Sequence, residues 1–356
     1  MRIFNTQPVI YNKQVLIKNT KASEKSNVEY STLPSYTSLV KGSNISFGMI
    51  NQGMKILHSE AKNLRCAYSG RQLIPNDVFL TIQEKLIKRP NIQSAINLLK
   101  QFEPFMHEVE ASVFEVFSDK QYRNKKDFQQ ILVELKQYSL PRLKDKQLRA
   151  FDSSKIIIEK LPDDTKNRVN SIIEQCKNQI ADDTFCRRYP LEELEKLITL
   201  SLDNKYLLEL YKTWYKTLPS SLNDFDAFVV KYSRKSHDKI AERLVSTAVA
   251  TIEHYTPVAS ILSEKNALKT EISDYLLVSA DLNNEKHEMS LNKFIWLYDE
   301  IDVPKNLQRY VNDSYKLCKN PKSELSKKPY YAEKVVEKIN KIVGGSFRLK
   351  IKKASW

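Results

Sequence analysis

Glycine is scarce in this chain: its 356 residues include six glycines, and none lies between Gly70 and Gly344. Loops that cradle phosphates or dinucleotides need several glycines, because their backbones adopt positive φ angles or come very close to the ligand. The shortage therefore excludes a Walker-type phosphate loop and a dinucleotide-binding fingerprint from the body of the chain.

Cysteine is also rare, and the chain has no long apolar run. The four cysteines, Cys66, Cys176, Cys186 and Cys318, show no paired framework, which is typical of a reducing compartment. No apolar stretch approaches the length of a membrane span, and the first residues lack the apolar core of a signal peptide. We therefore expect a cytoplasmic protein without membrane association.

Acidic residues are outnumbered, with 43 Asp and Glu against 57 Lys and Arg, so the net charge is +14. Such a balance favours a polyanionic partner, above all the phosphate backbone of DNA. The densest basic segment runs from Lys231 to His237, and Lys231, Arg234 and Lys235 are the candidate nucleic-acid contacts, with Arg243 close behind. The plain alternative for this cluster is a solvated surface.

The ends of the chain differ in character from its middle. Residues 1–50 are polar and weakly periodic, which predicts an extended arm. Residues 347–353 alternate apolar and basic side chains, which predicts a strand whose basic face meets either solvent or DNA. Between about 80 and 235, apolar residues recur at helical spacing. The prolines expected to end the helices there are Pro104, Pro141, Pro162, Pro190 and Pro219.

Two features inside this helical region have structural explanations. Tyr211, Trp214 and Tyr215 lie at helical spacing, which indicates packing between helices, with a base-stacking platform as the alternative. His107 precedes a predicted helix and has no partner histidine near it in sequence, so we expect it to pack at a helix start.

Chemically suggestive residues follow the helical region. Residues 249–254 are rich in β-branched side chains and predict a strand, residues 274–278 predict a second strand, and a helix begins after them. The first strand carries Glu253 and His254, an oxygen ligand beside a base of near-neutral pKa. Helical spacing places Asn283 and His287 on one face, four residues apart.

This layout resembles the HNH (ββα-metal) endonuclease family. The resemblance implies that Glu253 is a metal ligand and that His254 is the general base. It makes Asn283 a helix ligand and His287 a second one, with Mg²⁺ or Mn²⁺ as the cofactor. Asp274 takes the place of the asparagine that orients the histidine in the family. Lys286 matches a basic residue that touches phosphate there.

The zinc-binding half of the family pattern is degenerate. One knuckle reads Cys66-Ala-Tyr-Ser69-Gly70, and the other reads Ser279-Ala-Asp-Leu282. One cysteine in place of four cannot hold a structural Zn²⁺. We therefore expect no structural zinc, and we expect Cys66 to lie near Ser279 and Leu282 in a small cluster that replaces the metal.

The predicted fold is mainly α with a small α+β module: a split, zinc-less ββα-metal core with a long α-helical insertion. One expected function is a metal-dependent DNA endonuclease of a phage or mobile element. The alternative is a non-catalytic nucleic-acid-binding or structural protein, such as a subunit of a phage or nucleoprotein assembly. The location would be the bacterial cytoplasm or a virion.

The predicted segments are 1–50 (arm), 51–79 (knuckle remnant), 80–235 (insertion), 236–300 (HNH-like core) and 301–356 (C-terminal helices and basic strand).

Overall fold

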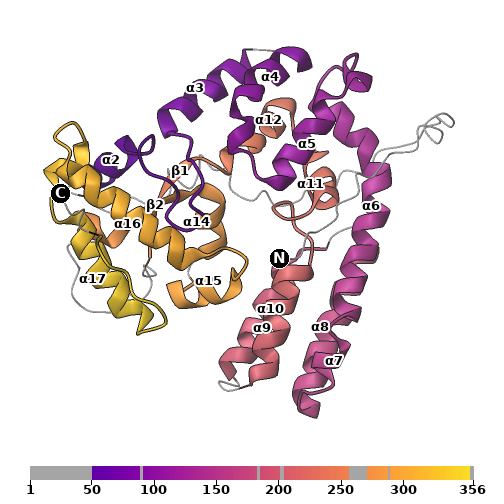
Figure 1. Ribbon diagram of the computed structural model, residues 1–356. Helices are drawn as coiled ribbons and strands as arrows, with labels where there is room; N and C mark the ends of the chain where they lie inside the picture. Colours follow the sequence, from indigo (N-terminus) through magenta and orange to yellow (C-terminus); the bar gives the residue numbers. More distant parts are fainter. Residues whose placement is uncertain are drawn as a thin grey trace, which may run out of the picture. The chain divides into compact units, whose positions relative to one another are not determined.

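The computed structural model (Figure 1) describes residues 50–88, 91–182, 185–200, 204–255, 271–287 and 289–352. The clustering of contacts separates residues 1–47 from residues 48–356. The first of these units, and with it nearly all of the expected arm, lies outside the described residues. Within the second unit the chain is mainly helical and has a small two-stranded antiparallel sheet. None of its described helices combines the length and the apolar character needed to cross a membrane.

The sheet is a short hairpin that leads directly into a helix. Strand β1 (Ala250–His254) runs antiparallel to β2 (Tyr275–Ser279), so that Ala250 pairs with Ser279 and His254 pairs with Tyr275. Helix α14 (Ala280–Lys286) follows β2 without a loop. Both predicted strands are confirmed within one residue, because their β-branched and aromatic side chains suit a strand that is largely buried.

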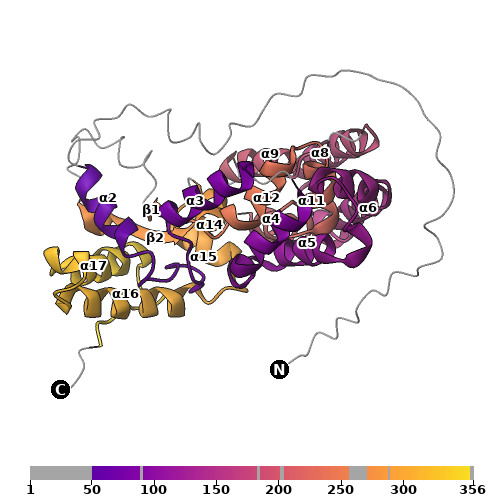
Figure 2. The same cartoon turned by 90° about the horizontal axis from the view of Figure 1, so that it is seen from above.

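The hairpin and the C-terminal helices share one hydrophobic core with residues from the start of the described chain. Its elements include α2 (Ile50–Ser59), α15 (Leu291–Leu297), α16 (Val303–Lys319) and α17 (Tyr331–Val343). Leu57, Tyr68, Leu277, Phe294 and Val335 are all fully buried in this core. Figure 2 shows α2, α16 and α17 around the two strands. Two segments far apart in sequence therefore build the layer around the hairpin.

Helices α3 to α12 fill the chain between these two segments. Trp214 is fully buried in one of their cores, and Tyr211 and Tyr215 are buried beside it, which confirms the packing role of that stripe. The helices are α3 (Asn76–Ile87), α4 (Ile92–Leu99), α5 (Glu108–Ser118), α6 (Phe128–Asp152), α7 (Lys155–Ile158), α8 (Asp163–Ala181), α9 (Arg188–Leu200), α10 (Lys205–Thr217), α11 (Phe225–Tyr232) and α12 (His237–Ser246).

Two prolines expected to end helices lie inside them. Pro141 lies in the middle of α6, and Pro190 lies in the first turn of α9. A first turn tolerates proline, because its N–H groups have no partner within the helix. At Pro141 one backbone hydrogen bond is missing, but α6 buries Leu132 before the proline and Leu143 after it. Packing on both sides therefore keeps the helix continuous.

The C-terminal segment does not form the predicted basic strand: residues 347–352 have no strand partner among the described residues. Side-chain amides accept their backbone N–H groups instead. Leu349 N donates to Asn340 Oδ1 at 2.8 Å, and Lys350 N donates to Gln308 Oε1 at 3.0 Å. The segment is therefore held against α16 and α17 by side chains that substitute for a neighbouring strand.

His237 joins the start of α12 to the start of α6. Its Nδ1 accepts a hydrogen bond of 3.0 Å from Phe128 N, and its ring stacks on Phe128 with centroids 4.5 Å apart. Burial lowers the pKa of His237 from 6.5, against the attraction of Asp127 and Asp238. The contact between α12 and α6 therefore requires the neutral imidazole, because Nδ1 must accept the hydrogen bond from Phe128 N.

We predict that stability falls as the pH drops below about 6.5, the ordinary pKa of histidine. In that range the unfolded chain takes up a proton at His237 that the folded chain resists, so the free energy of unfolding decreases. The His237→Asn variant keeps an acceptor near the Nδ1 position and should lack this component. Denaturant unfolding followed by circular dichroism from about pH 8 to about pH 5 measures the difference. Parallel pH profiles for the two proteins would contradict the prediction.

Candidate functional site

Helix α14 turns one face toward strand β1, and this face carries two of the expected site residues. Asn283 Nδ2 donates to Thr251 Oγ1 at 3.2 Å and to the carbonyl of Ile252 at 3.4 Å. Lys286 Nζ lies 2.6 Å from Glu253 Oε1 and 3.0 Å from the carbonyl of His254. The fold thus brings the end of β1 and the helix together.

The contact between Glu253 and Lys286 is a buried ion pair. The side chain of Lys286 has no exposed surface, and that of Glu253 is 6% exposed. Burial raises the pKa of Glu253 to about 7, although the nearby Lys286 ammonium lowers it. The expectation that Lys286 contacts phosphate is therefore wrong in this arrangement, because its charge faces Glu253 inside the protein.

His254 occupies the last position of β1 and is half-buried. Its ring centroid lies 4.1 Å from that of Tyr275, and its Nδ1 is a buried atom without a hydrogen-bond partner among the described residues. Burial lowers the pKa of His254, an effect that the Asp274 charge opposes and Lys286 reinforces. A neutral imidazole with a free nitrogen is chemically suited to accept a proton.

The two remaining site candidates lie apart from this face of α14. Asp274 accepts a hydrogen bond of 2.7 Å from Glu271 N and forms an ion pair with Lys338. No hydrogen bond joins its carboxylate to His254 among the described contacts, so its influence there is electrostatic. His287 is exposed at the C-cap of α14: its N–H donates to the Asn283 carbonyl at 2.9 Å, and its positive φ of 42° ends the helix.

These side chains do not fit a divalent metal ion well. Among the described residues, no group of three or more His, Cys, Asp or Glu side chains comes close enough to hold one. Glu253, the carboxylate expected to bind the cation, already has its charge matched by an ammonium group. A metal ion at this position would have to displace the Lys286 ammonium from Glu253. Because Lys286 is fully buried, its charge would then lie inside the protein without a partner or water.

The Cys66 sulfur lies in a turn that packs against the start of α14. The Cys66 sulfur accepts hydrogen bonds from Ser69 N at 3.5 Å and from Ser279 N at 3.3 Å, and it lies 3.5 Å from Ser279 Oγ. Gly70 closes the turn with a φ of 68°, where a side chain would be strained and would clash with Asn306. The predicted proximity of Cys66 and Ser279 is confirmed, and Leu282 is buried in the same core.

The opposite face of α14 holds the inserted helices. His107 Nδ1 lies 2.9 Å from Asp281 Oδ2. Glu285, one turn further along, accepts hydrogen bonds from the Tyr215 hydroxyl at 2.5 Å and the Tyr298 hydroxyl at 2.9 Å, and Arg187 lies 3.2 Å from it. Sequence reasoning missed these contacts. The i, i+4 spacing of Asp281 and Glu285 shows that they share a face of the helix. It does not predict their partners, which are distant in sequence.

The expected nucleic-acid cluster is divided by burial. Arg234 and Lys235 are exposed in the turn between α11 and α12. Lys231 is exposed along its length, while its ammonium lies 3.3 Å from Ser221 Oγ and above the Tyr232 ring. Arg243 is buried and forms an ion pair with Glu110. Arg243, which lies close behind the cluster in sequence, therefore contributes no exposed charge to it.

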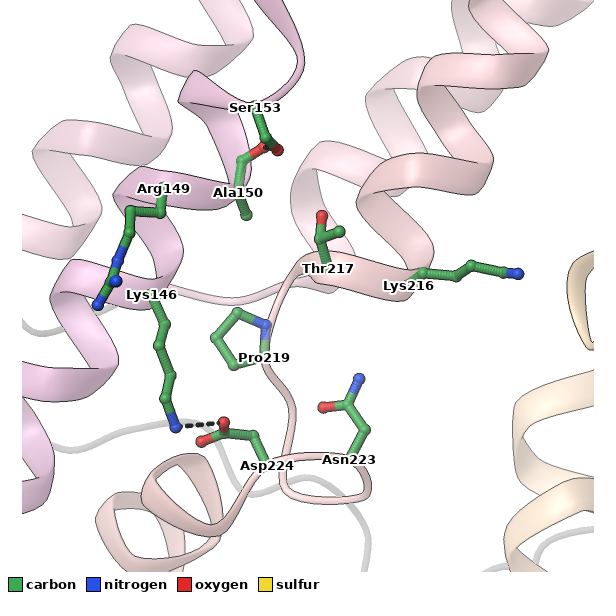
Figure 3. A pocket seen from close by; sticks show the side chains of 9 residues that line it. All are labelled: Lys146, Arg149, Ala150, Ser153, Lys216, Thr217, Pro219, Asn223 and Asp224. Carbon is green, nitrogen blue, oxygen red and sulfur yellow. Dashed lines mark hydrogen bonds and ion pairs between the residues drawn. The ribbon is translucent and has the colours of Figure 1, made fainter. Parts of the chain in front are cut away.

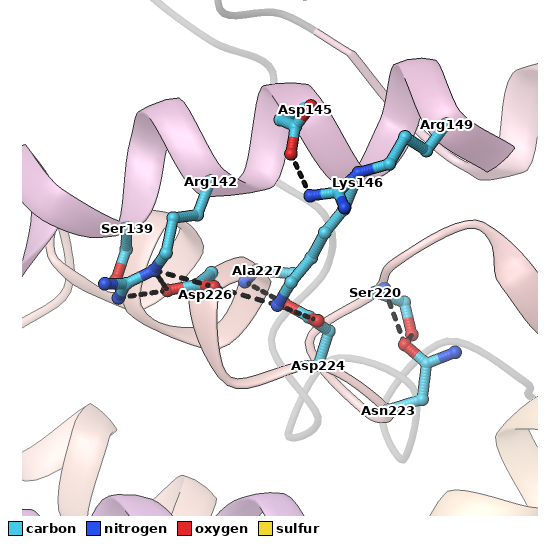
Figure 4. A network of polar contacts seen from close by, with 10 residues as sticks. All are labelled: Ser139, Arg142, Asp145, Lys146, Arg149, Ser220, Asn223, Asp224, Asp226 and Ala227. Atoms are coloured by element: carbon cyan, nitrogen blue, oxygen red, sulfur yellow. Dashed lines mark hydrogen bonds and ion pairs between the residues drawn. The ribbon is translucent and has the colours of Figure 1, made fainter. Parts of the chain in front are cut away.

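A polar hollow of about 420 Å³ lies between α6, α10 and the start of α11 (Figure 3). Its cations are engaged with carboxylates, as the surrounding network shows (Figure 4). Lys146 Nζ lies 2.6 Å from Asp224 and 2.8 Å from Asp226, and Arg142 lies 2.7 Å from Asp226. Asp224 also caps α11 by accepting from Ala227 N. This network fastens α11 to α6 and leaves little unmatched charge for an anion.

We predict that Lys286→Met lowers the free energy of unfolding by about 3 kcal/mol, because it leaves a buried carboxylate without its partner. Adding Glu253→Gln should recover much of the loss. The matched control is Lys316→Met, which removes a lysine that is 76% exposed and paired with Asp313 on the surface. Its effect should stay below about 1 kcal/mol. Equal stabilities of the Lys286→Met and Lys316→Met variants, measured by denaturant unfolding, would refute the structural importance of this pair.

Comparison with known proteins adds no relative to this picture. No family model, no curated protein and no solved structure matches the chain significantly. The functional conclusions therefore rest on the geometry of its own residues.

Proposed function

We propose that the chain is a nucleic-acid-binding protein built on an HNH-like scaffold in which Lys286 stands where a nuclease would hold its cation. The observation that carries this proposal is the distance of 2.6 Å between Lys286 Nζ and Glu253 Oε1, with both side chains buried. A carboxylate matched by a buried ammonium gains little from a divalent cation, because the lysine would then be left beside like charge. The contact favours binding over hydrolysis.

Three features support the HNH-like scaffold. The β1–β2 hairpin leads directly into α14, which is the order of the ββα motif. The turn at Cys66 keeps backbone N–H groups directed at the sulfur and meets the start of α14 at Ser279. His254 ends β1 beside the helix that carries Asn283. In this interpretation the chain keeps the hairpin, the helix and the turn at Cys66, while Lys286 occupies the position of the metal ion.

Charge supports nucleic acid as the partner. The chain has a net charge of +14, and a protein of this charge attracts phosphate backbones over long distances. The turn between α11 and α12 exposes Arg234 and Lys235 a short distance along the chain from β1. Burial lowers the pKa of Lys231, at the end of α11, and the nearby charges of Arg243 and Lys235 lower it further, because positive charge gathers there. We therefore propose that DNA phosphates lie along this turn, in a phage particle or another nucleoprotein assembly.

A metal-dependent endonuclease is the second candidate. The observation in its favour is His254, whose pKa is lowered by burial, so that the imidazole is neutral and can accept a proton near pH 7. This function needs Lys286 to leave Glu253, so that the carboxylate could hold Mg²⁺ or Mn²⁺. The bound cation would then polarise a phosphodiester.

We predict that purified protein does not nick supercoiled DNA with Mg²⁺ or Mn²⁺, and that His254→Ala changes nothing in this assay. The reason is that Glu253 is occupied by Lys286. Agarose gel electrophoresis of the plasmid, with a known nuclease as the positive control, measures the result. Nicking by the wild-type protein that His254→Ala abolishes would establish the endonuclease and overturn the binding-only proposal.

We predict that neutralising Lys231, Arg234 and Lys235 together weakens duplex DNA binding about tenfold and flattens its salt dependence. The slope of log K against log salt should fall by about one for each phosphate that these side chains no longer neutralise. The control removes the same charge from α16 and the turn after it, through Lys316, Lys319 and Lys322 changed to Gln.

Fluorescence anisotropy with a labelled duplex at several salt concentrations measures both triple variants. Equally weakened binding in the two would mean that net charge matters and that the α11–α12 turn is no specific contact. If the wild-type protein binds no DNA even at low salt, the nucleic-acid proposal is overturned. An acidic protein subunit would then be the partner that the positive charge serves.

A further inference from the structure

A second hollow, of about 610 Å³, lies where α15 meets α9 and α10. Ile198, Leu208, Tyr211 and Trp296 supply its apolar wall, and Glu195 and Lys293 supply polar groups. Its volume is in the range of sites that bind small molecules, and a mainly apolar lining with a few polar groups is typical of them.

Two large apolar side chains remain exposed at this hollow. Trp296 is 37% exposed and Leu208 is 39% exposed, whereas the neighbouring Tyr211 and Trp214 are buried. The aromatic stripe of α10 is thus used in the core, as expected. Tyr211 also lines the hollow, whose more exposed aromatic ring is Trp296 of α15, a helix that the sequence pattern did not single out.

Two lysines flank the aromatic rings of the hollow. Lys212 Nζ lies 5.0 Å from the centroid of the Trp296 ring, and Lys293 Nζ lies 4.8 Å from that of Tyr211. Each lysine also has a carboxylate partner: Lys212 lies 2.8 Å from Asp299, and Lys293 forms an ion pair with Glu195. A ligand would therefore meet an aromatic surface with cations at its edge and a carboxylate inside.

Hydrogen-bonding groups converge on the same place. Glu195 accepts a hydrogen bond of 3.0 Å from the Tyr211 hydroxyl and keeps a second oxygen that can accept another. Asn292 donates its amide N–H to the carbonyl of Ile342 at 3.2 Å, which leaves its Oδ1 as an acceptor. Acceptors of this kind suit the N–H edge of a nucleobase.

We propose that this hollow binds an unpaired nucleobase of a single strand. The base stacks on Trp296, and its N–H edge faces Glu195 and Asn292. Stacking on an aromatic side chain combined with nearby cations is the general way in which proteins hold single strands. The inference rests on the proposed nucleic-acid binding and deepens it, because it names unpaired bases as a ligand.

The test uses the full chain in chelator, so that no cleavage contributes. The probes are a fluorescein-labelled oligodeoxythymidylate of about twelve nucleotides and thymidine monophosphate as competitor. Trp296→Ala should weaken binding of the oligonucleotide about tenfold or more, the effect expected for removing one base–aromatic stack. Tyr330→Ala, which removes an aromatic side chain that is 66% exposed elsewhere, should change nothing.

A second variant guards against a folding defect. Leu208→Glu places negative charge at a position that is already 39% exposed, so the protein should fold normally and repel the anionic strand. In otherwise wild-type protein carrying Trp356→Phe, tryptophan fluorescence should also be quenched when the oligonucleotide saturates the site. Competition by the monophosphate at affinity equal to the strand would identify a free nucleotide as the ligand. Weaker competition would identify a strand.

Unchanged oligonucleotide affinity in both Trp296→Ala and Leu208→Glu would overturn the inference. Duplex binding that still depends on the α11–α12 turn would then leave the proposed function intact. Conversely, a strand that binds through Trp296 in a protein with no affinity for duplex would support the hollow and refute the duplex contacts at that turn.

Discussion

The buried ion pair between Lys286 and Glu253 constrains much of the surrounding structure. Two opposite charges removed from water are tolerated only when each finds its partner, and removal of one leaves a costly uncompensated charge. Because Lys286 also donates to the carbonyl of His254, it fixes the end of β1 against α14. The neighbouring contact of Asn283 with Thr251 and Ile252 completes this attachment. The distance between the histidine strand and the helix is therefore set by charge pairing.

The same helix connects the hairpin to the inserted helices, because its opposite face carries Asp281 and Glu285. These carboxylates meet His107, Arg187 and Tyr215, which come from segments separated in sequence by many helices. The helices between α2 and the hairpin are thus part of the support of the candidate site. Helix α10 contacts Glu285 of α14 through the Tyr215 hydroxyl, and Tyr298, which follows α15, contacts the same carboxylate.

Local patterns predicted the parts of the fold that depend on local forces. The two strands followed from β-branched residues, whereas the contact between Cys66 and Ser279 was expected from the HNH resemblance. Pro141 was misjudged, because packing on both sides of it outweighs one missing hydrogen bond. The prediction for Lys286 failed for a related reason. Helical spacing gives the face of α14 on which Lys286 lies, but it does not show that Glu253 of β1 is packed against that face.

The sequence by itself determined the mainly helical class, the hairpin with its following helix, the burial of Trp214 and the excess of positive charge, since each depends on composition or on short periodic spacing. Only the tertiary structure decided which charges are matched. It paired Lys286 with Glu253 and Arg243 with Glu110, and it left Trp296 partly exposed beside Lys212. The reason is that the effect of a charge depends on burial and on its nearest partner, and both are fixed when segments far apart in sequence come together.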